Sequence, residues 1–366
     1  MDISLKRVGT LTFANTVNYG ASLQACALCK TIESLGCECE VLNYSNSELD
    51  SRELGTHFTI NPTGAVRYFL RRGFERRRIE AFARFAQFNM NITERLDRAS
   101  LISKAQDLDC VFIGSDQVFN PRVNGHDSVF LGEGIVDVTR LASYAASLGD
   151  ATVDSITRCC GSAAQVFSNY VGLSVREPSS TNVLREMGLD PVFMPDPTLL
   201  LSGQEWSHVA TGEELDSIPD SYVLLYTLNS ESKLIGRSLE IGKRLGVPVV
   251  CVHYNTKNIE GVFNLRDIGP SAFLRLVENA EFVCTDSFHG ACFSINFNKP
   301  FIVKTSEAAV QSNVRIIDLL NHYGLNDCLF REGQHDATSV DFSRTSHVLE
   351  DDRRDARVFI AKCIGL

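Results

Sequence analysis

Short apolar runs alternate with longer amphipathic stretches along almost the whole chain, and this alternation is the strongest constraint on the fold. Several runs are continuously apolar, such as "CVFI" at 110–113, and such runs are typical of parallel strands covered on both faces. Strands alternating with helices predict doubly wound α/β layers. The expected strands are residues 8–13, 40–44, 110–113, 141–146, 170–175, 192–194, 222–227, 247–253, 282–285 and 301–304.

Two domains are expected from the length of 366 residues, because a domain takes roughly 150 residues. The polar, turn-rich stretch "SGQEWSHVATGEELDSIPDS" separates two expected strands. We therefore predict an α/β protein with two Rossmann-like domains, residues 1–200 and 201–366, that face a cleft. The last helix, residues 351–366, is a candidate for packing back across the boundary.

Composition and short motifs exclude several classes of protein. A net charge of −10 does not suit a general nucleic-acid binder. The N-terminus shows no signal peptide, and no apolar run is long enough for a membrane span. Neither a P-loop nor a G-x-G-x-x-G fingerprint is present, which argues against P-loop enzymes and dinucleotide dehydrogenases.

Twelve cysteines without a secretory signal indicate reduced thiols and a cytoplasmic protein. Four of them form C-x2-C-x7-C-x-C, which could indicate zinc. However, residues 20–36 fit an amphipathic helix and residues 37–44 an alternating strand, and small buried cysteines suit both. We therefore predict no metal site.

Residues 67–85, within an insertion near 67–90, interleave arginines with phenylalanines. One interpretation is a solvated helix with an apolar stripe toward the core. The other is a cationic face for an anionic membrane surface or a lipid diphosphate. The arginines are Arg67, Arg71, Arg72, Arg76, Arg77, Arg78 and Arg84.

Polar clusters follow five of the expected strands. Ligands of doubly wound domains bind outside the carboxyl ends of strands, so five such clusters in two domains suggest a cleft between them. Each also has a plainer interpretation. Asn18 and Asp116 can cap local turns, Arg176 and Glu177 can form a surface ion pair, and His289 can be a satisfied core histidine.

Seven segments, in order, resemble the polysaccharide pyruvyl transferase family: "NYGASLQACAL", "FIGSDQVFNP", "SYAASLG", "LSVRE", "PDPTLLL", "FVCTDSFHGACFSINFNKPF" and "RIIDLLNHYGL". They span about residues 8–325. The resemblance implies a two-domain fold similar to GT-B glycosyltransferases. It also implies transfer of the enolpyruvyl carbons of phosphoenolpyruvate (PEP) onto two hydroxyls of a sugar, which gives a pyruvyl ketal in a capsular, exopolysaccharide or cell-wall glycan. PEP is a co-substrate, and no cofactor is expected.

Ketal formation needs a proton delivered to the methylene carbon of PEP. The resemblance makes His289 the active-site histidine, and a histidine suits a general acid near neutral pH. Gly290 would let the backbone approach the donor closely. Arg176 matches the arginine after the family's apolar strand, and a guanidinium binds phosphate or carboxylate bidentately.

The chain departs from the Arg-Leu-His form of the family, because it has Ser-Phe-His with Ser287 in place of arginine. The missing donor-binding charge must come from elsewhere, and Arg315 and Arg275 are candidates. Asn313 and the start of the helix at "RIIDLL" could add N–H donors for an anion.

The acceptor is expected on the N-terminal domain, where Asp116 could accept a hydroxyl proton. A lipid-linked acceptor would place the protein at the inner face of the membrane. The other expected acceptor-binding residues are Asn18, Tyr19, Gln117, Asn120 and Tyr144.

Two alternatives stay open. A GT-B-like glycosyltransferase would share the fold but bind a nucleotide sugar rather than PEP. A non-catalytic glycan-binding protein would keep only the fold, although the presence of both His289 and Arg176 counts against it.

Overall fold

The computed structural model describes residues 5–13, 16–46, 48, 62–210, 215, 218–255, 257–305, 310–333 and 340–366, with the backbone alone at 62–72 and 310–312. The chain forms two compact units, each described by itself. Unit 1 comprises Met1–Gly55, Ala86–Leu201 and Leu349–Leu366, and unit 2 comprises Thr56–Phe85 and Ser202–Val348.

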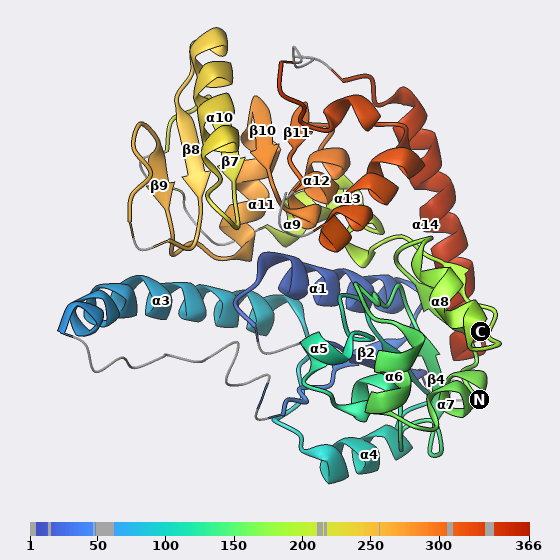
Figure 1. Ribbon diagram of the computed structural model, residues 1–366. Coiled ribbons are helices and arrows are strands. Elements are labelled where there is room, and N and C mark those ends of the chain that lie inside the picture. The colour runs from blue at the N-terminus through green and yellow to red at the C-terminus, as the bar shows by residue number, and fades with distance from the viewer. Residues whose placement is uncertain are drawn as a thin grey trace. The chain divides into compact units, whose positions relative to one another are not determined.

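A parallel four-stranded sheet forms the centre of unit 1, in the order β2-β1-β3-β4. Its two outer strands, β2 and β4, are labelled in Figure 1. A short parallel pair, β5-β6, continues beyond β4 through a bridge between Ala146 and Val175. The α/β class with parallel sheets is thereby confirmed. The strands are β1 (Arg7–Leu11), β2 (Glu38–Val41), β3 (Cys110–Ile113), β4 (Arg140–Ser143), β5 (Ser174–Val175) and β6 (Val192–Phe193).

The apolar side chains of β3 alternate between the two faces of this sheet, and each face is covered by its own hydrophobic cluster. Val111 and Ile113 lie in one hydrophobic cluster and Cys110 and Phe112 in another, because successive side chains of a strand point to opposite faces. The helices of unit 1 are α1 (Tyr19–Ser34), α4 (Arg98–Gln106), α5 (Pro121–Asn124), η1 (Ser128–Leu131), α6 (Val153–Cys159), α7 (Ala163–Ser168), α8 (Ser180–Glu186) and η2 (Pro197–Leu199).

Unit 2 has a parallel five-stranded sheet in the order β11-β10-β7-β8-β9. All four residues of β10 are buried, as its apolar sequence predicts. The strands are β7 (Val223–Tyr226), β8 (Val249–Val252), β9 (Phe263–Leu265), β10 (Phe282–Thr285) and β11 (Phe301–Val303). The helices are α9 (Gly203–Val209), α10 (Ser232–Leu245), α11 (Pro270–Asn279), α12 (Phe288–Asn296), α13 (Val310–Tyr323) and η3 (Asn326–Cys328).

The long helix α3 (Pro62–Asn89) belongs for most of its length to unit 2, whereas the sequence analysis assigned it to the N-terminal domain. Two of its arginines contact other residues of unit 2. Arg77 forms an ion pair with Asp267 at 2.6 Å, and the guanidinium carbon of Arg78 lies 4.7 Å from the ring centre of Tyr254.

The final helix, α14 (Ser343–Ile364), ends in the core of unit 1. Ala356 and Ile360 lie fully buried in the same cluster as Cys110 and Phe112. Arg353 donates hydrogen bonds to the carbonyls of Leu199 and Leu201, which are the last residues of unit 1 before the chain enters unit 2.

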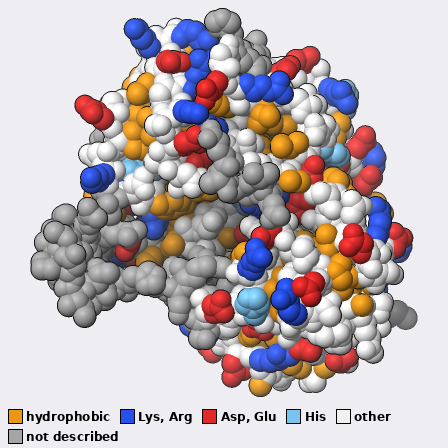
Figure 2. Space-filling view, in the orientation of Figure 1, with side chains coloured by type: hydrophobic (Ala, Val, Ile, Leu, Met, Phe, Trp, Pro, Cys, Tyr) orange, Lys and Arg blue, Asp and Glu red, His pale blue; other side chains and the backbone are white. Residues whose placement is uncertain are grey.

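Acidic and basic side chains are intermixed on the face shown in Figure 2. The net charge of −10 is therefore not gathered in a single patch on this face. Within the described ranges, every helix is too short or too polar to cross a membrane.

Candidate functional site

The turn after β10 places His289 at the start of α12. Ser287 is the N-cap of this helix, and its hydroxyl accepts a hydrogen bond from the Gly290 N–H at 3.4 Å. The Thr285 hydroxyl donates to the carbonyl of Tyr226 and accepts from the Ser287 N–H. The cap and the threonine together fix the direction in which the chain leaves the strand.

Gly290 has a packing role in the structure. A Cβ atom at this position would lie 2.3 Å from the Thr285 hydroxyl oxygen. The glycine therefore allows α12 to pack closely on the end of β10. That its backbone also approaches the donor stays a prediction.

His289 is the second residue of α12, and only 8% of its surface is exposed. Its ring meets the Phe288 ring edge-to-face, with centroids 5.2 Å apart. The guanidinium carbon of Arg315 lies 6.0 Å from the centre of the same Phe288 ring, within cation–π range. The structure thus brings together three of the residues expected around the donor: Ser287, His289 and Arg315.

The helix that carries Arg315 begins earlier than predicted. α13 starts at Val310, so Arg315 lies more than one turn inside it rather than at its opening. Asn313 is the fourth residue of α13 and stays a predicted donor-binding residue.

Two polar residues near this turn were not predicted as functional. The carboxylate of Asp286 accepts hydrogen bonds from the N–H groups of Leu228 and Asn229 and from the hydroxyl of Thr227. It therefore fastens the loop after β7 to the turn that carries His289.

Lys304 follows β11 directly, and its side chain is only 7% exposed. Its ammonium group forms an ion pair with Glu231 at 2.7 Å and lies 5.8 Å from the Phe330 ring centre. Its backbone N–H donates to the carbonyl of Thr285, which sets it beside the end of β10. A lysine directly after an apolar strand was the sequence signal that could have identified it.

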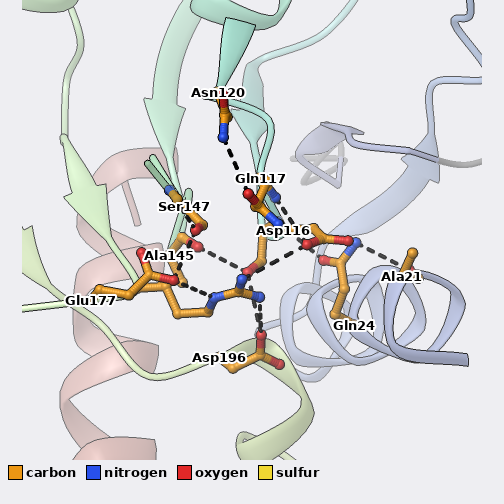
Figure 3. A network of polar contacts seen from close by, with 12 residues as sticks. Ala21, Gln24, Asp116, Gln117, Asn120, Ala145, Ser147, Glu177 and Asp196 are labelled. Carbon is orange, nitrogen blue, oxygen red and sulfur yellow. Dashed lines mark hydrogen bonds and ion pairs between the residues drawn. The ribbon is translucent and has the colours of Figure 1, made fainter. Parts of the chain in front are cut away.

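Arg176, in unit 1, lies among three carboxylates, which are labelled in Figure 3: Asp116, Glu177 and Asp196. Its guanidinium contacts Asp196 at 2.8 Å, Glu177 at 3.1 Å and Asp116 at 3.7 Å. Only 1% of its side chain is exposed. Burial alone would lower its pKa, but Glu177, Asp196 and Asp116 outweigh that effect and raise it above the ordinary value, so the group stays charged.

Arg176 and Glu177 thus form a buried ion pair rather than the surface ion pair of the plainer interpretation. The surrounding carboxylates do not favour binding of an anionic donor by Arg176. His289 and Arg176 belong to different units. That both face a single donor site stays a prediction.

Asp116 is the most exposed carboxylate of this network, with 17% of its side chain accessible. It adopts a left-handed backbone conformation with φ of 65°, which is uncommon for a residue other than glycine. Its loop is held by Gln24 of α1, which accepts a hydrogen bond from the Ser115 N–H and donates to the Thr12 hydroxyl. Gln24 was another residue that the sequence analysis did not assign.

The five expected acceptor-binding residues divide into two groups. Gln117 follows Asp116, is partly exposed, and donates its backbone N–H to the Asp116 carboxylate. Asn18 is exposed, and it caps α1 by accepting from the Ala21 N–H, as in the plainer interpretation. These two can still meet a ligand.

The other three are buried, which argues against direct contact with a sugar. Asn120 caps α5 and donates to Gln117 and Asp150. Tyr19 is only 1% exposed. Tyr144 is fully buried beside Phe359, and burial raises its pKa well above the usual value.

The four cysteines of the C-x2-C-x7-C-x-C pattern are buried, and three of them lie in the hydrophobic core. The sulfurs of Cys29 and Cys39 are 3.0 Å apart. Over the described part of the chain, no group of three or more His, Cys, Asp or Glu side chains is placed to hold a metal ion.

Solved structures with a similar fold belong to enzymes of sugar nucleotides and to glycosyltransferases. A protein described as a UDP-N-acetylglucosamine 2-epimerase from Listeria monocytogenes has a TM-score of 0.50 and 10% identity, over 99% of this chain and 91% of that one. The epimerase from Rickettsia bellii has a TM-score of 0.49 and 10% identity, over 98% and 95% of the two chains. The glycosyltransferase SnogD from Streptomyces nogalater has a TM-score of 0.45 and 12% identity, over 99% and 96%. The likeness to the Listeria monocytogenes structure concerns the α/β fold alone.

Sequence comparison gives the family. No curated protein matches the chain. The model of the polysaccharide pyruvyl transferase family matches residues 18–307, which include both the Asp116 loop and the turn with His289. Because this match covers well over half of the sequence, the chain belongs to the polysaccharide pyruvyl transferase family.

Proposed function

We propose that this protein transfers the enolpyruvyl carbons of PEP onto two hydroxyls of a glycan sugar, to give a pyruvyl ketal and phosphate. Membership of the family supports a transferase with a polysaccharide acceptor. The observation that carries the proposal further is the group formed by His289, Phe288 and Arg315 at the start of α12. It combines a proton donor with a cation, which PEP chemistry requires.

In the proposed reaction, His289 donates a proton to the methylene carbon of PEP, which becomes a methyl group. One sugar hydroxyl attacks C2, and the second hydroxyl displaces phosphate from the same carbon. One of the two hydroxyl protons balances the proton that the methyl group gains, and the other leaves on phosphate. A histidine can return to its acidic form between turnovers at neutral pH.

The anionic groups of PEP would be met by Arg315, by Ser287 and by the N–H groups at the start of α12, where the helix dipole favours negative charge. Arg315 would thus supply the charge that Ser287 does not. The reaction needs no cofactor.

Asp116 would accept a proton from the attacking hydroxyl, with Gln117 and Asn18 as hydrogen-bonding partners of the sugar. Asp116 suits this role because it is the carboxylate of its network that solvent reaches. None of the twelve cysteines is in a disulfide, which fits a reducing cytoplasm. A lipid-linked acceptor at the inner face of the membrane would be consistent with that location.

The test is phosphate release from PEP by the purified protein, with a panel of lipid-linked and free glycans as acceptors. We expect release that depends on the acceptor, together with a product whose mass grows by one pyruvyl ketal. The fold similarity favours one competitor, a glycosyltransferase that uses a nucleotide sugar. Sugar transfer from UDP-sugars without phosphate release from PEP would establish that competitor and overturn the proposal.

A further inference from the structure

Asp196 belongs to the segment "PDPTLLL", which the proposed function leaves without a role. It lies between β6 and η2, and its side chain is inaccessible to solvent. One carboxylate oxygen accepts from the Arg176 guanidinium at 2.8 Å. The other accepts from the N–H and the hydroxyl of Thr198, at 2.9 and 2.7 Å. Both oxygens are therefore fixed in place.

The fixed carboxylate in turn fixes Arg176. Asp196 binds one terminal nitrogen of the guanidinium, and Glu177 binds the nitrogen nearest the stem. Glu177 is itself held, because it accepts from the hydroxyls of Ser147 and Ser180. The second terminal nitrogen faces Asp116 at 3.7 Å. Three carboxylates around one guanidinium leave an excess of negative charge, which opposes the approach of an anion such as PEP.

Asp116 is the member of this network that can act on a substrate. Its side chain is 17% exposed, against 4% for Glu177 and none for Asp196. Its backbone stays in the left-handed region at a cost in energy, so the surrounding contacts must hold it there. Its carbonyl accepts from the Ser147 N–H at 2.8 Å, and its carboxylate lies 3.7 Å from the Arg176 guanidinium.

We propose that Asp196 and Arg176 are positioning residues, which hold the Asp116 carboxylate where it accepts the proton of the attacking sugar hydroxyl. This inference rests on the proposed function. It changes the expected role of Arg176 from a donor-binding residue to one that acts through another side chain. A displacement of a catalytic group by about 1 Å can reduce turnover about a hundredfold, so such a support has a measurable effect.

A double-mutant cycle tests the inference, with kcat and the KM for PEP measured by phosphate release. Asp116→Asn should reduce kcat by about two to four orders of magnitude, as expected for loss of a general base. Asp196→Asn keeps the size of the side chain but weakens its hold on Arg176, and should reduce kcat about 10- to 100-fold. In the Asp116→Asn background the Asp196→Asn change should have almost no further effect on kcat, because the carboxylate that Asp196 positions is then absent. The KM for PEP should stay the same throughout.

Asp127→Asn is the matched control. Asp127 caps the 3-10 helix η1 by accepting from the Val129 N–H, as Asp196 caps η2, but it has no contact with Arg176 among the described residues. It should lower thermal stability without changing kcat. If Asp196→Asn does not fold, Arg176→Lys replaces it in the cycle. Lysine keeps the positive charge but lacks the forked N–H donors of the guanidinium.

Three outcomes separate the hypotheses. Independent, multiplicative losses from the two Asn substitutions overturn the positioning role. A raised KM for PEP in Arg176→Lys also overturns it, because Arg176 would then bind the donor. A wild-type protein that releases no phosphate from PEP with any acceptor overturns the proposed function, and this inference with it.

Discussion

The position of His289 depends on three small or polar neighbours rather than on the histidine itself. Thr285 ends the strand, Ser287 caps the helix and Gly290 lets the helix approach the threonine. The contacts among these three residues join positions at most five apart, while Thr285 also donates to the carbonyl of Tyr226 on the neighbouring strand. The location of the histidine at a strand end could therefore be predicted from the sequence.

Replacing His289 by alanine tests its role as general acid. We expect turnover to fall by about two to four orders of magnitude, because proton transfer by a positioned side chain contributes that much. The fold should persist, since the N-cap and the glycine contact do not involve the imidazole. Phosphate release and circular dichroism are the measurements. Near-normal release from a folded variant would contradict the role.

His253 gives a prediction about stability and pH. It follows β8 and is almost fully buried, and its two ring nitrogens contact the Asn264 side-chain oxygen and the Asn255 N–H. Burial lowers its pKa and Arg266 adds to this effect, while the bond to Asn264 opposes it, and the net direction is down. The unfolded chain therefore takes up a proton as the pH falls below about 6.5, while the folded protein does not.

The free energy of unfolding should consequently decrease as the pH falls through this range, and His253→Gln should show a smaller decrease. Urea unfolding at pH 7.5 and 5.5 compares the two proteins. His208→Gln, which replaces an exposed histidine on α9, is the control and should behave like the wild type. An equal pH dependence in His253→Gln and the wild type would show that His253 does not contribute.

At the scale of elements, most strands match a predicted one, whereas strand β9 and the placement of two helices were not predicted. Continuous apolar runs such as β3 and β10 are fixed by local sequence, because any strand covered on both faces needs them. α13 begins five residues before the predicted start, and α3 belongs mostly to unit 2. The partners of α3, Asp267 and Tyr254, lie far from it in sequence, so no local pattern could indicate them.

The core role of α14 can be tested with two substitutions on the same helix. Ile360 is fully buried in unit 1, while Val358 is 64% exposed. Ile360→Ala should lower the free energy of unfolding by about 2–5 kcal/mol, because it removes buried methyl groups and leaves a cavity. Val358→Ala should change it by less than about 0.5 kcal/mol. Similar midpoints of urea unfolding for the two variants would contradict this packing.

The arginines of α3 have two interpretations, a solvated helix and a cationic membrane face, and an experiment can distinguish them. Several already have partners in the protein, as Arg76 does with Glu80 and Arg77 with Asp267. For a cationic membrane face, we expect flotation with anionic vesicles, less with neutral ones, and loss of binding at high salt. Arg76→Glu should weaken binding at least about fivefold, since each basic group near an anionic surface contributes about 1 kcal/mol.

The matched control is Arg158→Glu on α6. Arg158 is also exposed and also pairs with a carboxylate four positions away, Asp154. It should not affect flotation. Equal recovery with neutral and anionic vesicles would instead support a solvated helix with an apolar stripe, whose core-facing residues are Phe82 and Phe85.

For the whole molecule, the fold class and the family followed from the sequence, but the environment of Arg176 did not. Its partners Asp196 and Asp116 lie 20 and 60 positions away, and only the folded sheet brings the three together. In the sequence alone, an arginine within a family motif suggests a group that binds an anion, because a guanidinium presents a fork of donors. In the structure, the carboxylates around Arg176 indicate a structural role instead. Burial likewise argues against Tyr19 and Tyr144 as acceptor-binding residues, since sequence does not tell a core tyrosine from a surface one.

The twelve reduced cysteines are spread through both units, and eleven of them are buried. A thiol reagent can modify a buried sulfur only when that part of the chain opens, so the rate of modification reports the free energy of local opening. Cys284 on β10 and Cys292 on α12 lie on either side of His289 in the sequence, and both are fully buried. These two native thiols lie close in sequence to the candidate active site, so slower labelling of their sulfurs in the presence of PEP would report ligand binding without an engineered label.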